Sequence, residues 1–294
     1  MLTFIIAIVA YFVMSDYPST AKFLTPAERK EVARRLKSDH NGLADEFDMR
    51  YFRDAITDWK VYVHMFITIA VYTSNYSIAL FLPTIIRTLG YTNETAQLMT
   101  VPPYIFACIT CISGGIIGDR ARQRGIFMIG FDLLSIVGLV MLIATHNFHV
   151  KYAAVFFVAG GFFPMVPMGA AWQANNAGGS LKRGVAIAMH VGFGNLGGKL
   201  PAPPILIPFL LITLGILASF IFLTKDSPQF VQGLSILIGL NGMAIVLSLA
   251  MTIYYRKENA RRDREHKAPE LYTEEEKRQE RTKGDYATFF RYTK

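Results

Sequence analysis

Charged side chains are missing from long stretches of this sequence. Only 18% of its 294 residues are Asp, Glu, Lys or Arg, and none of these lies in residues 61–86, 95–118, 152–181 or 227–255. A helix of about 20 apolar residues crosses the ~30 Å hydrocarbon core of a bilayer. Helices that are apolar all round need a buried position or lipid. The missing charge therefore excludes a soluble globular protein and predicts an all-α polytopic membrane protein.

Cysteine is also scarce, and the two present, Cys108 and Cys111, lie in one expected span. This spacing can indicate redox chemistry or a metal site. Here it puts both on one helical face beside small residues, which let membrane helices approach closely. We interpret the pair as packing positions and expect no metal site and no cofactor. Nucleophile–base pairings and phosphate-binding loops are missing too, so we expect no enzymatic activity.

The charge that is present is basic, with a net value of +8. It collects in residues 16–60, in the loop 119–124 and beyond residue 256. Lys and Arg gather on the cytoplasmic side of membrane spans. This pattern makes the lipid bilayer the expected partner, rather than nucleic acid, and puts those segments in the cytoplasm. We expect a multi-pass protein of the plasma membrane.

The alternation of charged and uncharged segments predicts the order of regions along the chain. Residues 1–14 reach only about 21 Å as a helix, so we interpret them as a truncated transmembrane helix. Residues 15–58 form a central cytoplasmic loop, with a helix expected from Thr25 to Lys37 because Thr25 and Glu28 have capping-box spacing. Residues 256–294 form a cytoplasmic tail, expected to be solvated or disordered. Residues 59–255 hold the spans, at about 59–82, 97–118, 125–145, 152–172, 184–223 and 234–255.

The stretch 184–223 is about twice as long as one crossing needs. Because the basic tail belongs in the cytoplasm, the number of crossings here must be odd. We therefore expect one crossing plus an anomalous insert at 199–215. Our hypothesis is that this insert is a translated intron.

Several short motifs recur in an order typical of one transporter group. They are Ser74-Asn75-Tyr76 with Phe81 to Ile86, Gly118-Asp119-Arg120, Trp172 with Asn175 to Gly178 and Lys182-Arg183, Gly192 to Asn195, and Arg261 to Asp263 with Tyr286, Phe289, Arg291 and Tyr292. By these residues nearly the whole chain resembles the major facilitator superfamily. Within it, the chain looks like the fungal anion:cation symporters, the nicotinate and allantoate permeases. One departure is Arg122, which stands where the superfamily loop usually has a second glycine.

This resemblance implies a C-terminal six-helix half of such a transporter plus a remnant of the preceding helix. The implied function is transport of a small organic anion by proton symport with alternating access. The partners would be that anion, a proton, and either the missing N-terminal half or a second copy of this chain. Two alternatives stay open: transport of a neutral vitamin or dipeptide, and a non-transporting or inactive membrane fragment.

Polar side chains on the first full span share one helical face, by i, i+3 and i+4 spacing. Thr68, Tyr72, Asn75 and Tyr76 lie on it. Such groups need hydrogen-bond partners inside a bilayer, either in a cavity or on another helix. We predict that Tyr72, Asn75 and Tyr76 bind substrate.

On the fourth span, Trp172, Asn175 and Asn176 are candidate substrate-binding or cytoplasmic-gate residues, although Trp172 could equally be an interfacial anchor. On the fifth span, Asn195 is a further substrate candidate. His190 is the candidate proton-coupling residue, since an ionisable group inside a membrane is a functional candidate by default. The alternative is a packed, neutral histidine.

The loop between the second and third spans holds the candidate gating residues Asp119, Arg120 and Arg124. We expect them to latch helix ends on the cytoplasmic side. Asp132, in the third span, is expected to pair with Arg120 or Arg124.

Overall fold

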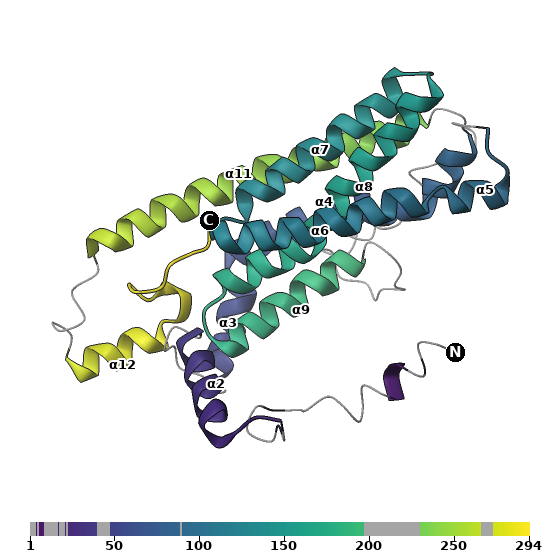
Figure 1. Cartoon of the computed structure of the whole chain (residues 1–294). Coiled ribbons are helices and arrows are strands. Elements are labelled where there is room, and N and C mark those ends of the chain that lie inside the picture. Colours follow the sequence, from purple (N-terminus) through teal and green to yellow (C-terminus); the bar gives the residue numbers. More distant parts are fainter. Residues whose placement is uncertain are drawn as a thin grey trace.

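The computed structural model describes residues 23–39, 48–88, 90–196, 230–265 and 273–294, with a few isolated positions before residue 22. This part of the chain is helical, with no strand, so the predicted all-α fold is confirmed. The helices, shown in Figure 1, are α2 (Pro26–Asp39), α3 (Met49–Thr57), α4 (Trp59–Arg87), α5 (Asn93–Leu98), α6 (Val101–Ala121), α7 (Gly125–Ala144), α8 (Phe148–Asn176), α9 (Ser180–Leu196), α11 (Val231–Glu265), α12 (Glu274–Thr282) and the 3₁₀ turn η3 (Gly284–Tyr286).

Among the described residues, five segments are long and apolar enough to cross a membrane: α4, α5 with α6, α7, α8 and α11. The chain is a multi-pass membrane protein. Of the stretch 184–223, the structure describes only its start, within α9. The expected insert at 199–215, most of residues 1–14 and the side chain of Asn195 lie outside the described residues.

Polar residues at the helix starts explain where several elements begin. The Asp58 side chain caps α4 by accepting from the backbone N–H of Lys60 at 3.0 Å. Thr25 and Glu28 cap α2, with the Glu28 carboxylate accepting from the backbone N–H of Thr25 at 2.8 Å. The predicted capping box is therefore present, and α2 begins where the sequence indicated.

Burial separates the spanning helices into an inner and an outer group. The most apolar windows of α4 and α8 are 67% and 61% buried, whereas those of α6, α7 and α11 are 22–33% buried. The outer three therefore expose much of their apolar surface. Cys108 is exposed on the outer side of α6, so our packing interpretation was wrong for that residue.

Close backbone approach joins α7 to α8. A Cβ atom on Gly161 would lie 1.9 Å from the Ser135 hydroxyl oxygen, and one on Gly138 would lie 2.8 Å from the Ala154 carbonyl oxygen. Only glycine permits this spacing, which is typical of membrane-helix contacts.

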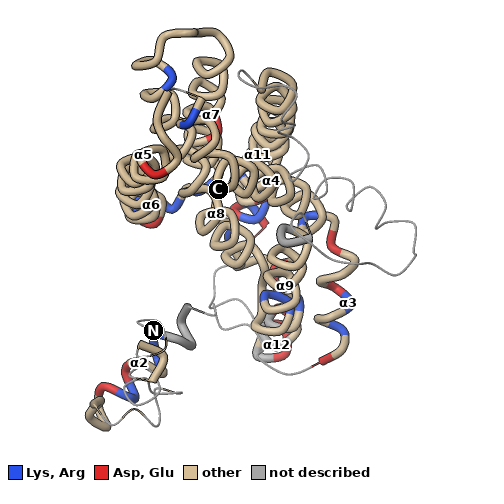
Figure 2. The backbone as a smooth tube through the Cα atoms, turned by 90° about the vertical axis from the view of Figure 1, so that its right-hand side faces the viewer, with Lys and Arg blue, Asp and Glu red and all other residues tan. Residues whose placement is uncertain are grey.

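The carboxy-terminal region differs from our prediction of a solvated tail. Helix α11 has 35 residues, about 52 Å at 1.5 Å per residue, and so runs well past the ~30 Å hydrocarbon core. Residues 284–294 then fold back against the end of the bundle, beside the start of α9 and the end of α11 (Figure 1). Figure 2 shows how charge concentrates outside the spans, in α2, α3 and the start of α9. The prediction of a solvated tail failed because two of its charged residues, Arg262 and Asp285, have buried partners rather than water.

Candidate functional site

His190 on α9 lies in a buried hydrogen-bond network between α4, α8 and α9. Its Nδ1 atom is 2.8 Å from the Thr68 hydroxyl and 2.7 Å from the Gln173 Oε1 atom. The Gln173 side chain is held in this orientation because its amide N–H donates to the Ala186 carbonyl at 3.0 Å. The Thr68 hydroxyl donates to the His64 carbonyl at 2.7 Å. Both partners of Nδ1 therefore accept, so this hydrogen-bond pattern assigns the hydrogen to Nδ1 and leaves Nε2 as the basic nitrogen.

A small cavity adjoins this network. It is lined by His64, Thr68, Tyr72 and His190, with apolar side chains from α4, α7 and α8 around them. The Tyr72 ring stands edge-on to the His190 imidazole, with 6.2 Å between ring centroids. The predicted polar face of the first span therefore does meet the predicted proton-coupling residue.

The other predicted residues of the first span take different positions. The Tyr76 side chain is 39% exposed and stacks edge-on against Tyr72 at 6.0 Å. The Asn75 amide donates to the Phe162 carbonyl on α8 at 3.4 Å. Asn75 thus makes an interhelical hydrogen bond, the alternative to a position in the cavity, while Tyr76 is partly exposed beside Tyr72.

His64 lies one helical turn before Thr68 and is also buried. Its Nε2 atom is 3.1 Å from the Tyr255 hydroxyl, and its ring packs edge-on to Trp172 at 4.7 Å. His64 lines a second small cavity with Lys60, Lys182 and other side chains. This histidine, which we did not predict, therefore links the two cavities.

A buried ionic cluster lies beyond that second cavity, formed by Asp58, Lys60, Lys182 and Asp285. The Lys182 ammonium is 2.7 Å from Asp58 and 2.6 Å from Asp285, and the Lys60 ammonium is 2.5 Å from Asp285. The four side chains are at most 4% exposed. Tyr292 completes the cluster, with its hydroxyl 2.8 Å from the Lys60 ammonium.

Two opposing effects act on the Asp285 carboxyl. Burial alone would raise its pKa, but the ammonium groups of Lys60 and Lys182 outweigh burial and hold the pKa below its ordinary value. Asp285 is therefore a carboxylate at neutral pH, and burial raises the pKa of the neighbouring Tyr292 so that its hydroxyl stays protonated.

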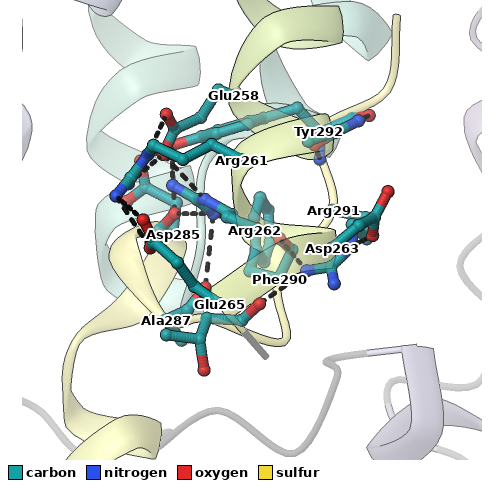
Figure 3. Close-up of polar contacts among 12 residues, drawn as sticks. Glu258, Arg261, Arg262, Asp263, Glu265, Asp285, Ala287, Phe290, Arg291 and Tyr292 are labelled. Atoms are coloured by element: carbon teal, nitrogen blue, oxygen red, sulfur yellow. Dashed lines mark hydrogen bonds and ion pairs between the residues drawn. The ribbon is translucent and has the colours of Figure 1, made fainter. Parts of the chain in front are cut away.

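Arg262 on α11 fixes the folded-back segment, as Figure 3 shows. Its guanidinium, 2% exposed, donates to the carbonyl oxygens of Asp285 at 2.7 Å and Phe290 at 3.1 Å. Its Nε–H donates to Glu258 at 2.9 Å. The guanidinium thus supplies hydrogen-bond donors to backbone carbonyl groups that are buried and cannot bond to water.

The predicted residues of α8 meet the same segment. Trp172, fully buried, donates from its indole nitrogen to the Thr293 carbonyl at 2.9 Å. Asn176 accepts from the Thr293 N–H at 2.7 Å, while Asn175 is exposed. Trp172 is therefore not an interfacial anchor, and of the two asparagines Asn176 contacts the segment whereas Asn175 is exposed.

The predicted gating loop is also tied to the carboxy-terminal segment. Arg124 forms an ion pair with Asp119, and the Lys294 carbonyl accepts from the Arg124 N–H at 2.5 Å. Arg120 is exposed. Asp132 is buried on α7 and its Oδ1 atom has no partner among the described residues. The prediction that Asp132 pairs with Arg124 is therefore wrong, because Arg124 pairs with Asp119 instead.

Sequence reasoning missed Asp58, Lys60, His64 and Asp285. Lys60 and His64 begin a span where basic residues are ordinary, and Asp285 stands in a segment of mixed charge. The available signal was a lysine just inside an apolar helix, which needs a partner when buried. Among the described residues, no group of three or more His, Cys, Asp or Glu could hold a metal ion.

Comparisons with known proteins converge on membrane transporters. The family model described as Major Facilitator Superfamily matches residues 1–200. An uncharacterised transporter of Schizosaccharomyces pombe is 33% identical over 189 residues, which are 64% of this chain and 39% of the relative. The high-affinity nicotinic acid transporter of Saccharomyces cerevisiae is 25% identical over 81% of this chain and 41% of its own. The major facilitator-type transporter hxnP of Emericella nidulans is 28% identical over 91% of this chain and 51% of its own.

The chain thus spans about two fifths of the length of the first two of these relatives. No solved structure matched it.

Proposed function

We propose, since the chain belongs to the Major Facilitator Superfamily, that its helices form one wall of a cavity through which a small organic anion crosses the membrane with a proton. The observation that carries this proposal is the placement of His190. Its Nδ1–H is held by Thr68 and Gln173, while its basic Nε2 is left to take a proton beside Tyr72. Histidine is the side chain whose ordinary pKa suits such a switch near neutral pH.

The proposed mechanism gives each residue a separate part. Gln173, itself oriented by Ala186, keeps the His190 ring in one orientation. A proton on His190 adds positive charge to the cavity wall, which attracts a carboxylate. The Tyr72 hydroxyl, and the more exposed Tyr76, supply hydrogen bonds to that carboxylate. Rocking of helical halves about a central site then moves both across.

The organic-anion substrate class rests on the resemblance to nicotinate permeases and on the yeast nicotinic acid transporter among the relatives. The substrate-binding roles remain predictions for Asn75, Trp172, Asn175, Asn176 and Asn195. The gating role of Asp119, Arg120 and Arg124 remains one too. The ion pair of Asp119 with Arg124 supports a latch at this end of the bundle.

Proteoliposomes test the proposal. Two preparations are made. One holds this chain alone, and the other holds it together with the part of the Saccharomyces cerevisiae nicotinic acid transporter that lies outside the matched region. Uptake of labelled nicotinate, with and without an inward proton gradient, is compared with uptake of the neutral nicotinamide. We expect gradient-driven nicotinate accumulation that His190→Asn abolishes and that the exposed-site control His149→Asn retains.

Each other outcome counts against a stated part of the proposal. Equal uptake of nicotinamide favours a neutral substrate, and uptake indifferent to the gradient removes the proton. No uptake in either preparation favours the non-transporting alternative.

A further inference from the structure

The Asp285 carboxylate is bound as a small carboxylate ligand would be. Its Oδ2 atom lies 2.5 Å from the Lys60 ammonium and its Oδ1 atom 2.6 Å from the Lys182 ammonium. The Tyr286 ring covers both cations, with its centroid 4.4 Å and 4.8 Å from them. Lys60 and Lys182 belong to the helices α4 and α9, whereas Asp285 belongs to the folded-back segment. The receptor and its occupant are therefore separate parts of the chain.

The charges of the cluster balance only while Asp285 is present. Lys60 and Lys182 contribute two positive charges, and Asp58 and Asp285 contribute two negative ones. Without Asp285, one buried positive charge is left uncompensated. The vacated place would then favour an anion of charge −1, because an unpaired buried ammonium is costly.

The place that Asp285 fills adjoins the candidate transport path. The cavity beside the cluster is lined by Asp58, Lys60, Lys182 and His64. His64 also lines the cavity that contains His190. A carboxylate at the two lysines would thus lie next to the histidine that links both cavities.

The folded-back segment 284–294 packs closely against the Gly178 backbone, at a contact that involves no charged group. A Cβ atom on Gly178 would lie 2.3 Å from the Asp285 backbone nitrogen, while one on Gly184 would meet nothing within 4 Å. A methyl group at residue 178 therefore displaces Asp285 from the lysines without altering any ionic group.

We propose that Lys60 and Lys182 form a carboxylate-binding site at this end of the bundle, and that Asp285 occupies it in place of a small carboxylate ligand. The segment 284–294 is then an intramolecular competitor for that site. The choice of a small organic carboxylate as ligand rests on the proposed transport function, whereas the site itself rests on the geometry of the lysines.

The test uses the full chain purified in detergent, with nicotinate as the carboxylate probe and nicotinamide as its neutral counterpart. The readout is the melting temperature as a function of probe concentration. Asp285→Asn and Gly178→Ala should each be stabilised by nicotinate at concentrations at least about tenfold lower than the wild type needs. Gly184→Ala and the exposed-site control Glu94→Gln, which lies on α5 away from the segment 284–294, should behave as wild type. Adding Lys182→Met to Gly178→Ala should remove the response.

A second measurement on the wild type covers the case in which the variants do not fold. Trypsin cleavage after Lys283 and Arg291 should speed up as nicotinate is added, because the probe displaces Asp285, and nicotinamide should have no effect. No stabilisation of any folded variant, an equal response to nicotinamide, or cleavage unchanged by nicotinate would overturn the proposal. His190→Asn should retain this binding, so failure of the transport proposal is distinguishable from failure of this one.

Discussion

The Trp172 indole nitrogen donates a hydrogen bond to the Thr293 carbonyl oxygen across 2.9 Å. The contact joins the middle of the sequence to its last residues, since the two positions are 121 apart. A buried tryptophan needs such a partner for its N–H group. Helix α8 and the carboxy-terminal segment therefore form one packed unit, in which the motif residues Trp172 and Asn176 hold the segment in place.

Replacing Trp172 by Phe should loosen the carboxy-terminal segment. The variant keeps an aromatic ring but loses one hydrogen bond, which contributes about 1 kcal/mol. The measurement is the rate of trypsin cleavage after Lys283 in the purified chain, which should rise roughly fivefold if cleavage follows the opened population. Trp59, 48% exposed, provides the control: Trp59→Phe should leave the rate unchanged. Equal rates in wild type and Trp172→Phe would contradict the role given to this contact.

The carboxy-terminal segment should stay packed against the bundle until the pH falls below the ordinary pKa of an Asp side chain, about 3.9. Because the pKa of Asp285 is lower in the folded state, its stabilisation is fully present above the ordinary Asp value of about 3.9. It is lost only as the pH falls through the depressed value. Hydrogen exchange of the Tyr292 and Thr293 amides reports docking, since these N–H groups donate to Asn259 and Asn176.

Their protection, corrected for intrinsic exchange, should stay constant from pH 8 to about pH 5 and fall below about pH 4. In Asp285→Asn this acid step should be absent. Loss of protection between pH 8 and pH 6 in the wild type would show that another group controls docking.

The fold could be predicted from the distribution of charge because lipid imposes a simple rule: spans lack charges and basic residues flank them. The same rule predicts a span that contains His190. It does not predict that Gln173 and Thr68 are the partners of this histidine, because helical spacing shows which residues share a face but not which neighbouring face they meet. Lys60 and Asp285 are 225 residues apart, and no local pattern connects them. Charge at residue 285 indicated solvent, whereas the fold supplies it with buried lysines.

The turn after α6 stores strain at Arg122. This residue is in the left-handed region with φ of 50°, where a side chain costs about 1–2 kcal/mol relative to glycine. Arg122→Gly should therefore raise the unfolding free energy by about 1 kcal/mol, measured by urea or thermal unfolding in detergent. Arg120 lies inside α6, where glycine is unfavourable, so Arg120→Gly should lower stability by about 0.5–1 kcal/mol. Destabilisation by Arg122→Gly would mean that the arginine side chain contributes more than its backbone costs.

The loop containing Arg122 should face the cytoplasm. Cys108 and Cys111 are first replaced by Ser, and single cysteines are then placed at residue 122 or at Asn93, which begins α5 at the opposite end of α6. A membrane-impermeant maleimide added to intact cells should label Asn93→Cys and leave Arg122→Cys unmodified until the cells are permeabilised. The physical reason is that translocating Arg120, Arg122 and Arg124 across the membrane is unfavourable. Labelling at residue 122 from outside intact cells would reverse the orientation. The ionic cluster of Lys60, Lys182 and Asp285 would then move to the outer side, and a cytoplasmic latch at Asp119 and Arg124 would be impossible.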